Sequence, residues 1–177
     1  MTAEQSLAQA VAATDDLAFE RLVEPLLHPG FDLACAVLRD PAAAEDAVQE
    51  AAVKAWRAFP GLRDEGRARA WFLKIVLNQC RATMRTRWWR SQLLADHVEG
   101  QVAAHDAGTE LRVDLERALR HLSRDQRAVL FLAYQMDLPY EEIARVLDVR
   151  VGTVKSRIHR AMGRLRSVLP SLPELTR

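Results

Sequence analysis

The chain has 177 residues, of which 49% are hydrophobic, so it can form one medium-sized domain or two small ones with apolar cores. That composition excludes wholesale disorder, and no apolar run approaches the roughly 20 residues needed to cross a membrane. The net charge of +1 conceals an uneven distribution. Residues 1–90 hold 12 bases and 12 acids, residues 91–111 hold four acids and no base, and residues 112–177 hold 13 bases and eight acids.

Residues typical of catalysis or metal binding form no recognisable pattern. Cys35 and Cys80 make no CxxC pair, which favours reduced, mostly buried thiols. The N-terminal residues "MTAEQSLAQAV" lack the basic and apolar regions of a signal peptide. We therefore predict a soluble, cytoplasmic protein that is not an enzyme and has no catalytic residue, cofactor or metal site. The histidines are scattered at His28, His97, His105, His121 and His159.

Apolar residues recur every three or four positions and nothing alternates with period two, so we predict an all-α fold. A first helical pattern covers about residues 17–38 and is interrupted near the "HPG" of residues 28–30. A second helix begins at Asp40-Pro41, an N-cap followed by a proline, and runs to about Phe59. Its predicted inward stripe is Ala44, Ala47, Val48, Ala51, Ala52, Ala55, Trp56 and Phe59, and Asp46, Gln49, Glu50 and Arg57 lie opposite.

A third helix is predicted from about Arg67 to Arg87, after the loop at residues 60–66. The stretch 67–90 has seven bases and no acid, which suits a polyanion such as nucleic acid. It also contains Trp71, Phe72, Trp88 and Trp89. We expect Phe72, Ile75 and Val76 in the core. A tryptophan left exposed beside arginines could stack on unpaired bases, although burial is the more frequent position of a large aromatic.

Residues 91–111 are polar and acidic and contain two glycines, so we predict a flexible acidic linker between domains at 1–90 and 112–177. We expect this linker to leave the two domains mobile until a partner fixes them. Ser123 and Gln126 have the spacing of a capping box, which predicts a helix from there to about Met136. Residues 171–177 form a tail.

The segment 140–166 has the geometry of a helix-turn-helix, with helices at about 140–147 and 151–169 around a turn at 148–150. On the second helix Val154, Ile158, Ala161 and Leu165 form one inward stripe. The run 150–166 contains six bases and no acid, as expected for a helix that enters the major groove. A helix hairpin with a charged outer face is the alternative interpretation.

Three stretches closely resemble the extracytoplasmic-function (ECF) sigma factors of bacterial RNA polymerase. "DPAAAEDAVQEAAVKAW" resembles their region 2.2, and "RAWFLKIVLNQCRATMR" resembles their region 2.4. "LSRDQRAVLFLAYQMDLPYEEIARVLDVRVGTVKSRIHRAMGRLR" resembles their region 4. The resemblance implies a helical region 2 domain, a helix-turn-helix region 4 domain and a subunit that selects promoters and helps to open them.

The resemblance also implies partners and binding residues. Core RNA polymerase would be bound through its β′ clamp helices and β flap, with Asp46, Gln49 and Glu50 on the β′ side, although a solvated polar face would look the same. The −10 promoter element would be held by Trp71, Lys74, Asn78, Arg81 and Arg85. The −35 element would be bound by Arg150, Thr153, Lys155, Ser156, Arg157, His159, Arg160 and Arg164. An anti-sigma factor is the expected further partner, and no residue indicates its type.

The chain departs from the family pattern at three positions. Pro139 stands where the family usually has a Ser or Thr cap, so Asp137 replaces that cap or proline simply starts the helix. Asp148 stands where glycine is common, and Asp tolerates the left-handed conformation better than most residues. Ala82 replaces a frequent Asp, which weakens the assignment of −10 contacts.

Two other classes of function remain open at this stage. A stand-alone transcriptional regulator would need a receiver or ligand domain, and residues 1–90 show no βα alternation. An enzyme is disfavoured because the chain has no P-loop, catalytic triad order or metal-spaced cluster.

Overall fold

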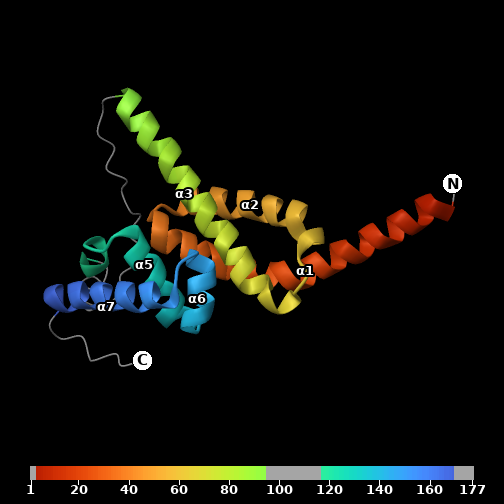
Figure 1. Cartoon of the computed structure of the whole chain (residues 1–177). Helices are drawn as coiled ribbons and strands as arrows, with labels where there is room; N and C mark the ends of the chain where they lie inside the picture. The colour runs from red at the N-terminus through yellow and green to blue at the C-terminus, as the bar shows by residue number, and fades with distance from the viewer. Residues whose placement is uncertain (1–2, 95–116, 170–177) are drawn as a thin grey trace.

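A computed structural model describes the backbone of residues 3–94 and 117–169 and the side chains of residues 16–86 and 117–169. Within these ranges the chain is helical without a strand, which confirms the all-α prediction. The first group (Figure 1) comprises α1 (Ala3–Leu38), α2 (Pro41–Ala58), the 3-10 turns η1 (Phe59–Gly61) and η2 (Glu65–Arg67), and α3 (Ala68–Leu94). The second comprises α5 (Arg124–Leu130), the π-helical turn η3 (Phe131–Gln135), α6 (Tyr140–Leu147) and α7 (Val151–Val168).

Helix α1 continues through the "HPG" segment, so the predicted interruption there is wrong. Pro25 and Pro29 both lie inside the helix, where each removes one backbone hydrogen bond. Buried residues on either side hold the helix together, because Val23 and Leu33 are in the core. Gly30 is buried against α3, and a Cβ atom there would lie 3.1 Å from Cε1 of Phe72. The glycine therefore permits close approach of two helices and does not end one.

Helix α2 begins as predicted, and the Asp40 carboxylate accepts a hydrogen bond from the Ala43 amide at 3.1 Å. Most of its predicted inward stripe is buried, from Ala44 to Phe59. Ala52 is half-buried, and Trp56 is 43% exposed with its ring edge-on to Phe19 at 5.0 Å. The tryptophan lies at the border of the stripe because α1 covers only part of this face.

Helix α3 extends to Leu94, beyond its predicted end and into the first residues of the predicted linker. Its predicted core residues Phe72 and Val76 are fully buried, and Ile75 is partly buried. The side chains of Trp88 and Trp89, most of the linker and the tail lie outside the described residues.

The second group follows the predicted helix-turn-helix closely. Ser123 and Gln126 form both hydrogen bonds of the capping box, but the helix they start changes to π geometry at Phe131 and does not stay α-helical to Met136. Pro139 is the N-cap of α6 and provides no side-chain hydrogen bond, so it simply starts the helix. Asp148 adopts the left-handed conformation with φ 59° and ψ 50°, as expected in the turn.

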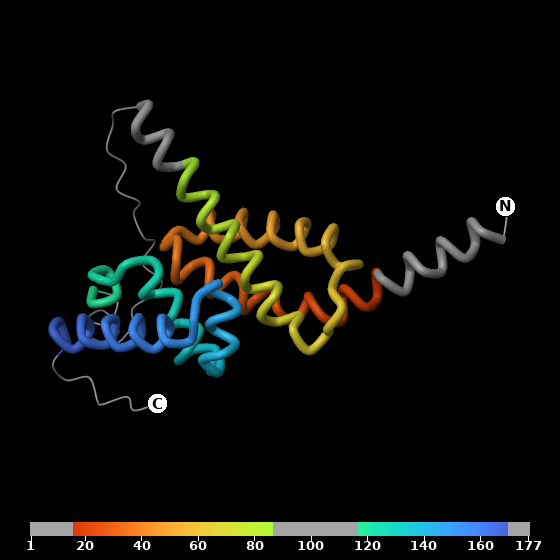
Figure 2. Tube along the Cα trace, viewed as in Figure 1, coloured from red at the N-terminus to blue at the C-terminus, as the bar shows by residue number. Residues whose placement is uncertain are grey.

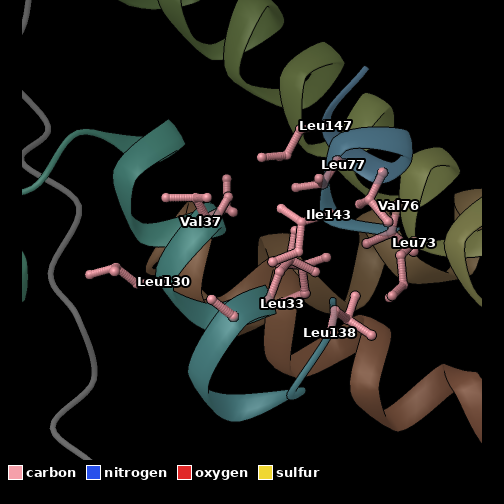
Figure 3. Packing of buried hydrophobic residues seen from close by; sticks show 14 of the residues in the cluster. Leu33, Val37, Leu73, Val76, Leu77, Leu130, Leu138, Ile143 and Leu147 are labelled. Atoms are coloured by element: carbon pink, nitrogen blue, oxygen red, sulfur yellow. The ribbon is translucent and has the colours of Figure 1, made fainter. Parts of the chain in front are cut away.

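The two groups pack against each other and share one hydrophobic core. In Figure 2 the segment that contains α5 to α7 lies beside the trace of α1 and α3. Helix α6 contacts α3, and α5 contacts α1. The two groups are in contact in this structure, and the mobility of the two predicted domains stays a prediction. Apolar residues on α6 and just before it are buried by the first group (Figure 3). A sequence pattern shows that a residue is apolar, but it does not show whether that residue is buried by its own domain or by the other one.

The glycine between α1 and α3 provides a test of this close approach. Gly30→Ala should lower the free energy of unfolding by about 1 kcal/mol, because a clash with the buried Phe72 outweighs the roughly 1 kcal/mol by which alanine favours a helix. Gly163→Ala is the control, since a Cβ atom there meets open space, and it should raise stability. Urea denaturation measures both, and a stabilised Gly30→Ala protein would contradict the close approach.

Candidate nucleic-acid interface

The N-terminal two-thirds of α7 presents an exposed polar and basic face. Val154, Ile158 and Ala161 are buried as predicted, together with Met162. The predicted −35 residues Arg150, Lys155, Ser156, His159, Arg160 and Arg164 are exposed, and Thr153 is half-buried. This face carries no acid, so it has the charge and shape that a major groove requires.

Several of these side chains are held in place by neighbours. Lys155 Nζ lies 5.7 Å from the centre of the Tyr140 ring on α6. Arg160 Nε donates to the Ser156 carbonyl at 3.2 Å, and Arg164 Nη1 donates to Oε1 of Gln126 at 3.0 Å. Arg160 as a whole is exposed, so a ligand can reach it. Positioning of this kind lowers the entropy that a side chain loses on binding.

Arg157 differs from the other predicted −35 residues. Its side chain is only 23% exposed, and its Nη2 lies 3.5 Å from Oδ2 of Asp125 on α5. Its Nη1 is buried and has no hydrogen-bond partner within the described part of the chain. Arg157 of α7 therefore packs against α5, and its binding to the −35 element stays a prediction.

The predicted −10 residues share one face of α3. Trp71, Lys74, Asn78, Arg81 and Arg85 follow one another at spacings of three and four. Asn78 and Arg85 are exposed and the other three are half-buried. Nη1 of Arg81 donates to Oδ1 of Asn78 at 3.1 Å, whereas Nζ of Lys74 forms an ion pair with Oδ1 of Asp148 at 3.0 Å. One member of the −10 set is thus already engaged by the helix-turn-helix.

The predicted polymerase-binding residues lie together on α2. Asp46, Gln49 and Glu50 are all exposed. Val53 follows them on the same face and is 46% exposed, which the sequence analysis missed. Val53 follows Asp46 by seven residues, and this helical spacing could have indicated that both lie on the same exposed face. The exposed face of α2 therefore combines acidic and apolar groups, a composition suited to binding protein.

Arg127 is a functional candidate that the sequence analysis missed entirely. From α5 its Nε donates to the Ala36 carbonyl at 2.7 Å and its Nη2 to the Val37 carbonyl at 2.9 Å, both at the end of α1. Burial, aided by Arg39 and Arg124, lowers the pKa of its guanidinium to about 10, so it remains charged at neutral pH. Its acceptors are backbone carbonyls, which every residue has, so the sequence does not indicate which carbonyls Arg127 binds.

The two cysteines are unpaired thiols, as predicted. Burial raises the pKa of Cys80 to about 12 and also raises the pKa of Cys35. Both are therefore protonated at neutral pH. Among the described residues, no group of His, Cys, Asp and Glu side chains could hold a metal ion. No helix in that part of the chain has the length and apolar character needed to cross a membrane.

Comparison with known families matches two parts of the chain. Residues 22–90 match sigma-70 region 2, and residues 112–165 match sigma-70 region 4. The ECF RNA polymerase sigma factor SigM of Mycobacterium tuberculosis is 31% identical over 166 residues, which cover 94% of this chain and 84% of SigM. The chain belongs to the ECF sigma factors. It is therefore a promoter-recognising transcription initiation factor and not an enzyme.

Two further relatives agree with this assignment. The RNA polymerase sigma-E factor of Streptomyces avermitilis is 33% identical over 160 residues, which cover 88% of this chain and 87% of that protein. A solved structure of the sigma factor RpoE in complex with the anti-sigma factor NepR, from Bartonella quintana, has a TM-score of 0.79 and 29% identity. That match covers 88% of this sigma factor and 99% of the RpoE chain. It therefore extends over both groups of helices.

The position of Arg157 predicts how its replacement affects this sigma factor. Arg157→Met should change the free energy of unfolding by less than about 1 kcal/mol, because an apolar chain of similar length keeps the contacts and removes a buried, unpaired N–H group. Arg157→Ala should cost more, since it also leaves a gap. Thermal denaturation followed by circular dichroism compares the two, and a methionine variant as unstable as the alanine variant would show that the charge is essential to the fold.

Proposed function

We propose that this sigma factor binds core RNA polymerase through the exposed face of α2, holds the −10 element on α3 and reads the −35 element with α7. The observation that carries the proposal is the exposed, acid-free face of α7, which follows α6 after the tight turn at Asp148. In a helix-turn-helix this second helix lies in the major groove. Such an assembly acts in the cytoplasm, where polymerase meets DNA.

On α7, Lys155, Ser156, His159 and Arg160 are the side chains proposed to lie nearest the bases. Arginine and lysine donate to guanine O6 and N7, and serine can bind bases or phosphates. Arg164 is better suited to a phosphate, because it lies farther along α7 than the four residues proposed to face the bases. Contacts to phosphates give affinity, while contacts to base edges give sequence selection.

Promoter opening in this proposal needs no covalent chemistry. Unpaired bases would stack or be captured on α3 beside Trp71 and Asn78. Each base stacked on an aromatic is worth about 1–3 kcal/mol, similar to the mean of about 1.4 kcal/mol for one DNA stacking step. A few captured bases can therefore hold a small bubble while polymerase and the −35 contact anchor the DNA.

An anti-sigma factor is the further partner we propose. The support is the likeness to RpoE, whose solved structure is a complex with the anti-sigma factor NepR. The likeness covers most of both chains and therefore includes the surfaces on which such a partner could act.

Run-off transcription with core polymerase on a randomised promoter library tests the function as a whole. Enrichment of templates that share two short elements, one near −35 and one near −10, is the expected result. A protein that binds promoter DNA tightly alone and gives no transcript with core polymerase would instead be a stand-alone regulator.

The assignment of Arg160 can be tested with a matched arginine on the same helix. Arg160→Ala should lower transcription from the enriched promoters by about 5- to 150-fold, the equivalent of one lost base contact of about 1–3 kcal/mol. Binding to core polymerase should be unchanged. Arg166→Ala is the control, because Arg166 is also exposed but lies in the last turn of α7. Equal losses in the two variants would remove Arg160 from the set of base contacts.

The proposed polymerase surface gives a separate prediction. Glu50→Lys should weaken binding to core polymerase by at least about tenfold, because a like or misplaced charge across a protein interface costs several kcal/mol. Glu24→Lys on α1 is the control, since Glu24 is exposed but lies on another helix. Fluorescence anisotropy of labelled protein titrated with core polymerase measures both. An unaffected Glu50→Lys variant would contradict the use of this face.

A further inference from the structure

The first turn of α5 contacts α7 through two adjacent polar side chains. Oδ2 of Asp125 lies 3.5 Å from Nη2 of Arg157. Oε1 of Gln126 accepts a hydrogen bond from Nη1 of Arg164 at 3.0 Å. The two arginines are seven positions apart, which is about two turns, so they lie on the same side of α7. Arg160 is three positions from one and four from the other, so this side adjoins the proposed base-reading face.

The two acceptors on α5 differ in charge, and they therefore act differently on the two arginines. The Asp125 carboxylate offsets the positive charge of Arg157, whose side chain is only 23% exposed. An amide is neutral, so Gln126 holds the guanidinium of Arg164 and leaves its charge in place. Arg164 is also exposed. Of these two arginines, Arg164 is thus the one with both the charge and the access to bind a phosphate.

The side chain of Gln126 is itself held by the end of its own helix. Its Oε1 also accepts a hydrogen bond from the Ser123 amide at 2.9 Å, which is one half of the capping box. An amide oxygen has two lone pairs, and the bonds from Ser123 and Arg164 use both. A residue that positions another must have its own rotamer fixed, and Gln126 meets this condition.

Buried apolar residues fix α5 against α7 below these polar contacts. Val129 and Leu130 of α5 are at most 7% exposed, as are Ile158 and Leu165 of α7. All four belong to one hydrophobic cluster, and the two helices are in contact. The first turn of α5 is therefore a firm support for the arginines of α7.

The capping box alone does not explain a glutamine at this position. Glutamate completes the same box, because its carboxylate accepts the same backbone N–H bond. A glutamate here would also form an ion pair with Arg164, and a DNA phosphate would have to displace it. Glutamine provides the cap and the contact with Arg164 without this competition.

We propose that Gln126 is a positioning residue for promoter binding, which keeps the charged Arg164 in place for a DNA phosphate beside the bases read by Arg160. The proposal rests on the function proposed above and adds a residue outside α7 to it. Gln126 acts through Arg164 and does not itself bind DNA. Asp125 has the opposite effect on Arg157, which it retains for the packing of α5 against α7.

Two substitutions of Gln126 separate its charge from its hydrogen bond. Gln126→Glu keeps the cap and the contact but adds a negative charge at Arg164. Gln126→Met keeps the length of the side chain and removes the acceptor. Gln135→Glu is the control for the first, because it adds the same charge at an exposed position of the same half. Ser123→Ala is the control for the second, because it weakens the capping box and leaves the Gln126 oxygen for Arg164.

The measurement is the affinity of holoenzyme, made from core polymerase and each full-length variant, for the enriched promoter at several salt concentrations. The slope of log K against log salt changes by about 0.9 for each phosphate contact. Arg164→Ala should lower the slope by about this amount, and Gln126→Glu should lower it by up to about 0.9. Gln126→Met should keep the slope and weaken binding about two- to tenfold, the cost of ordering one free side chain. Both controls should keep the slope and the affinity of the wild type.

A double variant tests whether Gln126 acts through Arg164. In the Arg164→Ala background, Gln126→Met should have no further effect on affinity, and Gln126→Glu should have no greater effect than Gln135→Glu. The order of preferred promoters in the randomised library should be the same for every variant, because phosphate contacts do not select sequence.

Each contrary result identifies what failed. If Arg164→Ala keeps the wild-type slope, Arg164 binds no phosphate and the proposal falls. If Arg164→Ala lowers the slope but Gln126→Glu behaves like Gln135→Glu, the positioning role is overturned. A Ser123→Ala loss equal to that of Gln126→Met would assign the effect to the helix cap and overturn it as well. A wild type that gives no promoter-dependent transcript with core polymerase would overturn the proposed function itself, before any variant is compared.

Discussion

The contact of α6 with α3 and of α5 with α1 is the constraint on which the rest of the structure depends. Leu138 and Ile143 are buried in one cluster with Leu33, Leu73 and Val76, which lie more than 60 positions away in the sequence. Full burial of one such side chain is worth about 1.5–3 kcal/mol, so a separated arrangement must cover these residues with another surface.

The same basic residues serve both the fold and the proposed DNA surface. Arg69 and Lys74 belong to the acid-free run that first indicated nucleic acid, and both bind groups of the second half in this structure. Arg127 does so from the other side, where the carbonyls at the end of α1 carry the negative end of the helix dipole.

The helix-turn-helix is the part of this sigma factor that could be predicted best. Its determinants are local: the capping box at Ser123, the left-handed residue at Asp148 and the inward stripe that begins at Val154. Each acts within a few residues, so its signal is complete in a short stretch of sequence. The face of α7 followed from the same periodicity, since the positions left outside the inward stripe are the exposed ones. Arg157 lies outside the inward stripe but is mostly buried, because it packs against α5 and pairs with Asp125 there.

The sequence by itself determined the helices, the family and the three candidate surfaces. Helical periodicity, caps and family motifs each depend on residues that are close together in the sequence. Tertiary structure alone decided that α1 continues through Pro29 and Gly30, that Trp56 is exposed, and that the two halves close on each other. These outcomes depend on which helix covers which face. Arg127 illustrates the reason, since its acceptors are backbone carbonyls about 90 residues away and every residue has a carbonyl.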